Sequence, residues 1–362
     1  MQTMHELAEI LQKIIMDWIT KSNESGLDEA IYSTINDGYF AKSDVEHAIE
    51  QLKLSVQRQE LTEWINQHSA ISSENVKKNN SRRVLCLHAG NLPLVGLQDM
   101  IAVLLSGVRY YGKISRKDPY LIPSLLKYIQ IQTTKFHIRF SLDITDFSNE
   151  NFQEWMFAGS EESLESLRFA LEKESIISAY NQRSLIRIAH FSVAIIDRWD
   201  PIICSDLVES MLRYRGKGCR SVAVIYSNFN LNDLTEELIA ESERWFKING
   251  GPHIVSTTVQ IRSAYNDAVG INQVQLGSSL VQEGIVSNDD PGIIYWQPIM
   301  NLNEIEMQFG QQLQQIYFLN FGNENDAKLV DNWKYDLLKN AQCPALWWRP
   351  DGIDVLNWIM SN

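Results

Sequence analysis

A cysteine among cations is the first feature of this sequence that could do chemistry. Cys219 lies in Arg215-Gly216-Lys217-Gly218-Cys219-Arg220, and nearby cations lower the pKa of a thiol and populate the reactive thiolate. Cys86 and Cys204 fall on apolar faces of expected elements, where we predict inert packing. No CxxC pair occurs, so we predict neither a zinc site nor a disulfide framework, and we give Cys343 no role.

An asparagine stands at a break between an expected strand and an expected helix. The strand ends in Gly90-Asn91-Leu92-Pro93. Asn91 either caps the following helix, as asparagine often does, or points its side-chain amide into a cleft.

Two further turns could bind a phosphate, although the dinucleotide fingerprint GxGxxG is absent from the sequence. Lys113, Arg116 and Lys117 follow the next expected strand. They either decorate a solvated turn or grip a cofactor phosphate, because ligands bind at the carboxyl ends of parallel strands. Gly159-Ser160 joins a strand to a helix and offers N–H groups and a hydroxyl to a phosphate. The alternative for Ser160 is a plain helix cap.

Alternating strands and helices must position these residues. The first 80 residues are predicted to be helical, with apolar stripes that begin at Leu7 and Val45. Beyond them the pattern alternates, which favours parallel βαβ units and an α/β fold. We expect strands at Val84–Ala89, Val108–Ile114, Phe136–Ile144, Trp155–Ala158, Ser192–Asp197, Val222–Tyr226, Ile254–Arg262, Ile293–Gln297 and Gln315–Asn320, and helices at Leu94–Ser106, Pro119–Ile131, Ser163–Glu172, Ser205–Arg215, Asp233–Lys247 and Asp326–Lys339.

Composition and charge exclude several classes of protein. The 362 residues are 44% hydrophobic and 21% charged, as in an ordinary globular protein with a sizeable core. The formal net charge is −13, which argues against a nucleic-acid partner because an acidic surface repels phosphate backbones. The longest wholly apolar run, Met100–Leu105, is far too short to span a membrane. We therefore expect a cytoplasmic protein without stable membrane insertion.

The chemistry-bearing segments, taken in order, resemble the aldehyde dehydrogenase superfamily. Within it they look most like the long-chain acyl-CoA reductase branch known from bacterial luminescence. The likeness is strongest from about residue 84 to 227, and no motif matches before residue 80. The segments that carry it are Gly90-Asn91-Leu92-Pro93, Lys113 with Ser115, Phe157-Ala158-Gly159-Ser160, Gly216-Lys217-Gly218-Cys219, Gln342-Cys343-Pro344-Ala345-Leu346 and Asp351-Gly352-Ile353-Asp354.

The resemblance implies roles for individual residues. Cys219 would be the nucleophile that takes an acyl group from a thioester. The side-chain amide of Asn91 and the backbone N–H of Cys219 would form the oxyanion hole. Lys113 and Ser115 would hold the adenosine ribose, and Gly159 with Ser160 would lie near the pyrophosphate.

The sequence departs from the hydrolytic members of that superfamily at one place. Those enzymes carry a glutamate in a Glu-Leu-Gly-Gly motif as the general base for water. The matching stretch here begins at Arg187, and no Asp or Glu occurs from Gln182 to Ile196. An enzyme that lacks this general base is suited to a reaction in which hydride, rather than water, attacks the acyl-enzyme. His190 is either a proton carrier or a histidine of the core.

A second departure concerns the choice of cofactor. NAD-preferring members have a glutamate three residues after the lysine that corresponds to Lys113, and here that position is Arg116. A carboxylate would bind the free 2′-hydroxyl and repel a 2′-phosphate, whereas a guanidinium does the opposite. The resemblance therefore predicts NADPH, with a solvated turn before Pro119 as the alternative reading of Arg116 and Lys117.

These inferences together predict a two-domain enzyme. We expect the N-terminal helices and a Rossmann-type NADP(H)-binding domain in residues 1–200, and an α/β catalytic domain with Cys219 and the C-terminal tail in residues 201–362. The predicted activity is reduction of a fatty acyl-CoA or acyl-carrier-protein thioester to the aldehyde, and assembly as a homo-oligomer is left open. The alternatives are an aldehyde dehydrogenase working in the oxidative direction and a non-catalytic relative that binds a nucleotide or docks a partner.

Overall fold

The protein divides into two compact units. The computed structural model describes residues 3–68, 81–148, 150–177, 182–188, 190–251, 254–286, 292–320 and 332–361. Unit 1 comprises Met1–Ala41, Val45–Ala189 and Ala345–Asn362, and unit 2 comprises Lys42–Asp44 and His190–Pro344. Within the described residues, no helix combines the length and the hydropathy that crossing a membrane requires.

Unit 1 is built on a five-stranded parallel sheet with the strand order β3-β2-β1-β4-β5. This is the order of a Rossmann-type sheet. Successive strands are added in one direction from β1 to β3 and in the opposite direction from β4 onward, so the order reverses between β1 and β4. The unit begins with a helix whose first turn is closed by a capping box between Thr3 and Glu6. The elements are α1 (Met4–Thr20), α2 (Ser22–Ser25), α3 (Leu27–Asn36), α4 (Lys42–Gln57), α5 (Glu60–Asn66), β1 (Arg83–Leu87), α7 (Leu97–Leu105), β2 (Arg109–Lys113), α8 (Leu121–Gln132), β3 (Ile138–Ser141), the 3₁₀ helix η1 (Ile144–Phe147), β4 (Glu154–Gly159), α9 (Glu161–Lys173), β5 (Arg183–Ile188) and α15 (Val355–Met360).

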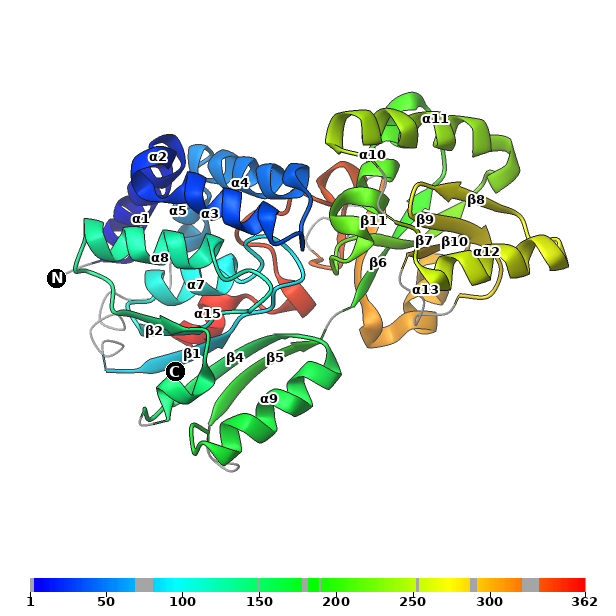
Figure 1. The fold of residues 1–362 in the computed structure, drawn as a ribbon. Coiled ribbons are helices and arrows are strands. Elements are labelled where there is room, and N and C mark those ends of the chain that lie inside the picture. Colours follow the sequence, from blue (N-terminus) through cyan, green and yellow to red (C-terminus); the bar gives the residue numbers. More distant parts are fainter. Residues whose placement is uncertain are drawn as a thin grey trace. The chain divides into compact units, whose positions relative to one another are not determined.

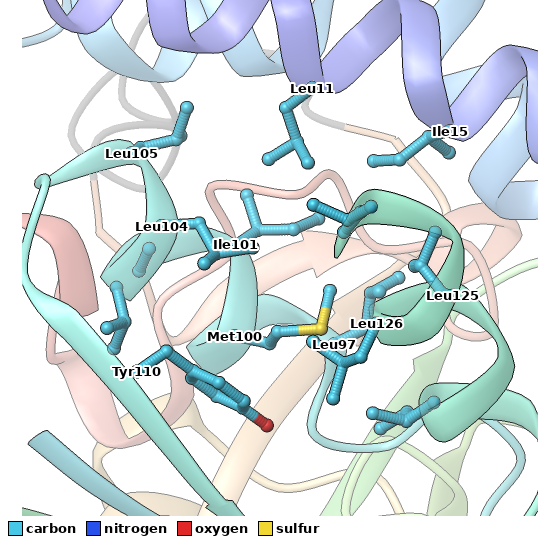
Figure 2. Packing of buried hydrophobic residues seen from close by; sticks show 14 of the residues in the cluster. Leu11, Ile15, Leu97, Met100, Ile101, Leu104, Leu105, Tyr110, Leu125 and Leu126 are labelled. Atoms are coloured by element: carbon cyan, nitrogen blue, oxygen red, sulfur yellow. The ribbon is translucent and has the colours of Figure 1, made fainter. Parts of the chain in front are cut away.

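Helices cover both faces of this sheet, which explains its apolar strands. The core on one face is shared by α1, α7, α8 and α15, whereas α9 and η1 pack on the other face (Figure 1). Figure 2 shows Met100 and Ile101 of α7 among side chains of α1 and α8, with Tyr110 of β2 beside them. The predicted stripes that begin at Leu7 and Val45 are buried in this same core.

Unit 2 is built on a seven-stranded sheet with the order β12-β11-β6-β7-β10-β9-β8. All pairs are parallel except that of the edge strand β8 with β9. Helices α10 and α11 pack on one face, and α12 and α13 on the other (Figure 1). The elements are β6 (Phe191–Ile196), α10 (Pro201–Leu212), η2 (Arg213–Gly216), β7 (Val222–Ser227), α11 (Leu231–Asn249), α12 (Thr257–Val269), β8 (Gln273–Leu276), β9 (Ser279–Glu283), β10 (Ile293–Pro298), α13 (Leu302–Phe309), η3 (Gly310–Gln312), β11 (Leu313–Phe318), β12 (Tyr335–Leu337) and η5 (Leu338–Asn340). The 3₁₀ helix η6 (Pro350–Gly352) belongs to unit 1.

Two predicted elements are wrong. The predicted strand Ile254–Arg262 is instead the start of α12, because Ser256 caps the first turn by accepting the N–H of Val259. Val259 and Asn266, two helical turns apart, are the buried positions of α12, so packing overrides the local β preference. The predicted helix Asp326–Lys339 lies partly outside the described residues, and its remainder forms β12 and η5.

The compact units also differ from the predicted ranges 1–200 and 201–362. The division falls at residues 189 and 190, because β6 pairs with β7 and β11 in the second sheet. The tail from Ala345 onward belongs to unit 1, because α15 buries Leu356 and Ile359 in the core that α7 shares.

Candidate functional site

Three of the predicted segments meet at one edge of the unit 1 sheet. Leu87, the last residue of β1, is in register with Lys113 of β2 on one side and with Phe157 of β4 on the other. The turns after β1, β2 and β4 therefore leave the same edge. Because the strand order reverses between β1 and β4, this edge is where a sheet of this type binds its ligand.

Close backbone packing joins the turn after β1 to the turn after β2. A Cβ atom on Gly90 would lie 2.1 Å from Ser115 Oγ, so only glycine fits there. The buried Asp118 braces the same junction, since its carboxylate accepts the N–H of Leu94 at 3.5 Å and that of Leu121 at 3.2 Å. Burial raises the pKa of Asp118, and these two backbone donors oppose that rise.

Asn91 does not cap the helix that follows it. Gly96 occupies the N-cap position of α7, and no side chain accepts a hydrogen bond there. Asn91 lies five residues earlier in the chain and is exposed at the carboxyl edge of β1. The helix-cap interpretation is therefore wrong, and the other predicted role, an amide directed at a ligand, stays a prediction.

The cations after β2 form a positively charged corner of this edge. Lys113 is half-buried, whereas Arg116 is exposed. Burial lowers the pKa of Lys113, the charge of Arg116 lowers it further, and Asp143 opposes both. The carboxylate of Asp143 is occupied by the N–H and hydroxyl of Thr145, at 3.0 and 2.9 Å. An anion bound at this corner would relieve the repulsion between the two cations.

Gly159 and Ser160 lie where β4 passes into α9. Ser160 is the N-cap of α9, and its hydroxyl accepts the N–H of Ser163 at 3.3 Å. The capping interpretation is thus confirmed for the side chain of Ser160. The N-terminus of α9 lies at the carboxyl edge of β4, and the predicted pyrophosphate contact stays a prediction.

A buried histidine separates this edge from the core. His88 follows β1 and shares a hydrogen bond of 2.6 Å with the hydroxyl of Tyr110. A Cβ atom on Gly96 would lie 1.7 Å from His88 Nδ1, so the imidazole also requires a glycine at that position. Burial lowers the pKa of His88 to about 4, which keeps the ring neutral near pH 7.

A buried ion pair lies on the α7 side of the same sheet. Arg187, near the end of β5, donates from Nη2 to Asp99 Oδ2 in the first turn of α7. Asp99 Oδ1 and Arg187 Nε are buried and form no hydrogen bond. Arg187 begins the stretch that the resemblance matches to the glutamate-containing motif, and its partner Asp99 went unnoticed in the sequence because 88 residues separate them.

Cys219 lies in unit 2, in the turn between η2 and β7. Its thiol is half-buried, and its carbonyl accepts a hydrogen bond of 2.8 Å from Ser192 Oγ. The turn that precedes it is left-handed, with positive φ at Tyr214, Arg215 and Gly216. Two such non-glycine residues cost free energy, which commonly marks a functional segment. Asn91 belongs to the other unit, so the oxyanion hole stays a prediction.

The surroundings of the other ionisable groups refine the predictions for the cysteines and their neighbours in both units. Arg220, expected to stabilise the Cys219 thiolate, is buried and bonded to residues near the end of the unit. Burial raises the pKa of Cys86 well above its ordinary value and that of Cys204 to about 12, in keeping with inert packing. His190 is half-buried just before β6, and its role remains a prediction. In the described part of the chain, no three His, Cys, Asp or Glu side chains gather into a group that could hold a metal ion.

Comparison with known proteins identifies the fold. No protein-family model matches the sequence, and a search of curated protein sequences finds no match. Solved structures do match. Aldehyde dehydrogenase 21 from Physcomitrella patens, in complex with the reaction product succinate, superposes with a TM-score of 0.67 at 13% identity, over 97% of this chain and 84% of that one.

Two further structures agree with this match. Methylmalonate-semialdehyde dehydrogenase from Oceanimonas doudoroffii gives a TM-score of 0.63 at 11% identity, over 96% of this chain and 84% of that one. The NADP-dependent glyceraldehyde-3-phosphate dehydrogenase from Bacillus halodurans C-125, complexed with NADP, gives 0.57 at 11% identity, over 93% and 78%. The protein therefore has the α/β fold of the aldehyde dehydrogenases.

Proposed function

We propose that the protein reduces a fatty acyl thioester to the aldehyde with NADPH, through an acyl-enzyme on Cys219. The fold supports this proposal, because it places a nucleotide-binding type of sheet edge in one unit and a half-buried thiol in the other. The order of the motifs Gly90–Pro93, Lys113–Ser115 and Gly216–Cys219 supports the acyl-CoA reductase branch.

The reaction follows from the chemistry of Cys219. Its thiolate attacks the thioester carbonyl carbon, and the bond from that carbon to the CoA sulfur breaks, so that CoA leaves as a thiolate. The side-chain amide of Asn91 and the backbone N–H of Cys219 stabilise the oxyanion. When bound, the reduced nicotinamide supplies hydride. Cys219 finally leaves the reduced carbon as a thiolate, which frees the aldehyde.

The observation that carries the reductive direction is the environment of Arg187. Arg187 begins the stretch that matches the base-containing motif of the hydrolytic members, and this stretch holds no Asp or Glu. The neighbouring carboxylate of Asp99 cannot act in place of that base, because Oδ2 is bonded to Arg187 and Oδ1 is buried from water. An acyl-enzyme without a base to activate water persists until hydride arrives.

The corner formed by Lys113 and Arg116 supports NADPH over NADH. The two cations lie close enough to repel one another, and burial further destabilises the charge of Lys113. A 2′-phosphate would offset both effects and would offer oxygens to the paired N–H donors of Arg116. Gly90 lets the turn after β1 pack directly against Ser115, the residue to which the resemblance assigns a ribose contact.

Trapping of the acyl-enzyme tests the proposal. The full-length protein is incubated with hexadecanoyl-CoA in the absence of NADPH, and its intact mass is followed. We expect the mass of one acyl group to be added and to persist, and NADPH to discharge it as aldehyde. The Cys219→Ala variant should take up no acyl group. Cys343→Ala is the matched control, because Cys343 is the other half-buried thiol among the described residues.

The competing functions give different masses over time. An adduct that hydrolyses rapidly to fatty acid would indicate the oxidative, hydrolytic reaction instead. If the wild type formed no adduct, the result would indicate a non-catalytic relative that only binds a nucleotide. Repeating the reaction with an acyl-carrier-protein thioester of the same chain length identifies the preferred donor, because both donors present the same bond to Cys219.

A further inference from the structure

The segment Asp336–Gln342 lies near the end of unit 2 and is here called the clasp. The function proposed above assigns it no role. The clasp runs from the end of β12 through η5 to the Gln342-Cys343-Pro344 motif. It encloses the residue that follows Cys219, although more than 100 residues separate the two in the sequence.

Arg220 is the residue that the clasp surrounds and binds. Its side chain is 6% exposed. The guanidinium donates to the carbonyls of Ala341 and Asn340, both at 2.9 Å, to Asp336 Oδ2 at 3.0 Å and to Gln315 Oε1 at 3.2 Å. Such a network fixes the planar side chain in position and direction.

Gln342 holds the same turn from its other side. Its amide Nε2 donates to the carbonyl of Ser210 in α10 at 3.0 Å and to Ser221 Oγ at 3.3 Å. The turn that carries Cys219 begins after α10 and ends at Ser221. Gln342 therefore joins the two ends of this turn, and it is itself buried.

Hydrogen bonds also hold the backbone at Cys219 and Arg220. The hydroxyl of Tyr317 donates to the carbonyl of Arg220 at 3.1 Å, and Ser192 Oγ donates to the carbonyl of Cys219 at 2.8 Å. The side chain of Arg220 thus points into the unit, whereas Cys219 is half-buried. The turn leaves Cys219 little backbone freedom.

We propose that Arg220 and Gln342, through the clasp, are positioning residues that hold the Cys219 thiol in the direction required for attack on the acyl carbon. The proposal rests on the function proposed above. Asp336 lies 3.0 Å from the guanidinium of Arg220 and balances its charge, and the carbonyls of Asn340 and Ala341 fix where that guanidinium lies. Displacement of a reacting group by about 1 Å can slow a reaction by about 100-fold.

Gln342→Met separates positioning from stability. It removes the hydrogen bonds of the amide to Ser210 and Ser221 but changes neither charge nor length greatly. The matched control is Gln282→Met in β9, which removes an equally buried glutamine bonded to Asn266 at 2.7 Å and distant in sequence from the Cys219 turn. For each variant we would measure the rate of acylation by hexadecanoyl-CoA, the rate of alkylation of Cys219 by iodoacetamide across pH, and the thermal midpoint.

A positioning role predicts a specific pattern. Gln342→Met should acylate about 10- to 100-fold more slowly than the wild type. Its alkylation rate and pH profile should stay within about 2-fold, because a small reagent reaches a thiolate from many directions. Gln282→Met should acylate normally at a similar thermal midpoint. In steady state, kcat should fall in Gln342→Met with little change in KM.

Arg220→Lys tests the alternative that only charge matters. Lysine keeps the positive charge but cannot reach four acceptors in the plane of a guanidinium. We expect it to acylate as slowly as Gln342→Met. Normal acylation by Arg220→Lys and Gln342→Met, or an equal fall in acylation and alkylation, would overturn the positioning role. A wild type that acylates on no residue would instead overturn the proposed function, which distinguishes the two failures.

Discussion

Replacement of His88 by glutamine is expected to remove a large part of the acid sensitivity of unit 1. Burial lowers the pKa of His88 to about 4, whereas the ordinary value is 6.5. Between these values the unfolded chain binds a proton that the folded chain does not bind. The free energy of unfolding therefore falls as the pH drops from about 6.5 towards 4, and this contribution then levels off.

The magnitude follows from the difference between the two pKa values. One unit corresponds to about 1.4 kcal/mol, so the full effect is about 3 kcal/mol, of which about 2 kcal/mol has been lost at pH 5. Glutamine suits the test because its amide can still bond to the hydroxyl of Tyr110 without gaining a proton. Urea unfolding followed by tryptophan fluorescence between pH 7.5 and 5 gives the two curves.

The wild type should lose about 2 kcal/mol more than His88→Gln over this range. His5, which is exposed on α1, supplies His5→Gln as a control for loss of a histidine at the surface. Parallel curves for the wild type and His88→Gln would refute the reasoning. They would mean that His88 accepts its proton in the folded chain, with the imidazole no longer packed against Gly96.

Three other outcomes are expected. Asn91→Ala should slow acylation about 10²- to 10³-fold with little change in thermal midpoint, because Asn91 caps no helix; a wild-type rate would remove it from the oxyanion hole. Arg116→Glu should abolish a preference for NADPH over NADH of roughly 10- to 150-fold, measured as the ratio of kcat/KM values, and an unchanged ratio would contradict the phosphate corner. Asp99→Leu and Arg187→Met should each lower the free energy of unfolding by about 3–5 kcal/mol, because each leaves a buried charge without its partner. The double variant should recover most of that loss in urea unfolding, and simple addition of the two losses would show that the pair is not coupled.

Local sequence patterns predicted the elements that carry continuous apolar runs. Strands β1, β4, β6 and β7 are largely such runs, since helices cover both faces of their sheets, whereas β2 has a buried centre, Tyr110–Gly112, between two cations. Strand β5 was not predicted, because Arg183 and Arg187 interrupt its apolar residues and its signal is a short alternation around Leu185. The start of α12 was mistaken for a strand, because its β-branched residues favour strands while a cap and two buried positions favour the helix.

The candidate site was predictable where the local backbone geometry allows only one type of residue. Gly90 allows a close approach that no other residue permits, and a glycine at a turn suggests as much. The partners of Asp99 and Arg220 could not be predicted, because Arg187 lies 88 residues from the first and Ala341 lies 121 residues from the second. The position of Asp118 before a proline and a helix is a typical signal for the start of a helix. No feature of the sequence indicated that its carboxylate also accepts the N–H of Leu94.

The return of the C-terminal tail to unit 1 has a consequence for synthesis on the ribosome. Unit 2 ends at Pro344, so all of its residues have been made before α15 exists. Until then Gln98 of α7 lacks the carbonyls of Leu346 and Trp348 that its amide binds, and Glu60 lacks the N–H of Leu346. The first unit to emerge is therefore the last to be completed, and nascent chains expose the α15-binding side of the α7 core while unit 2 folds.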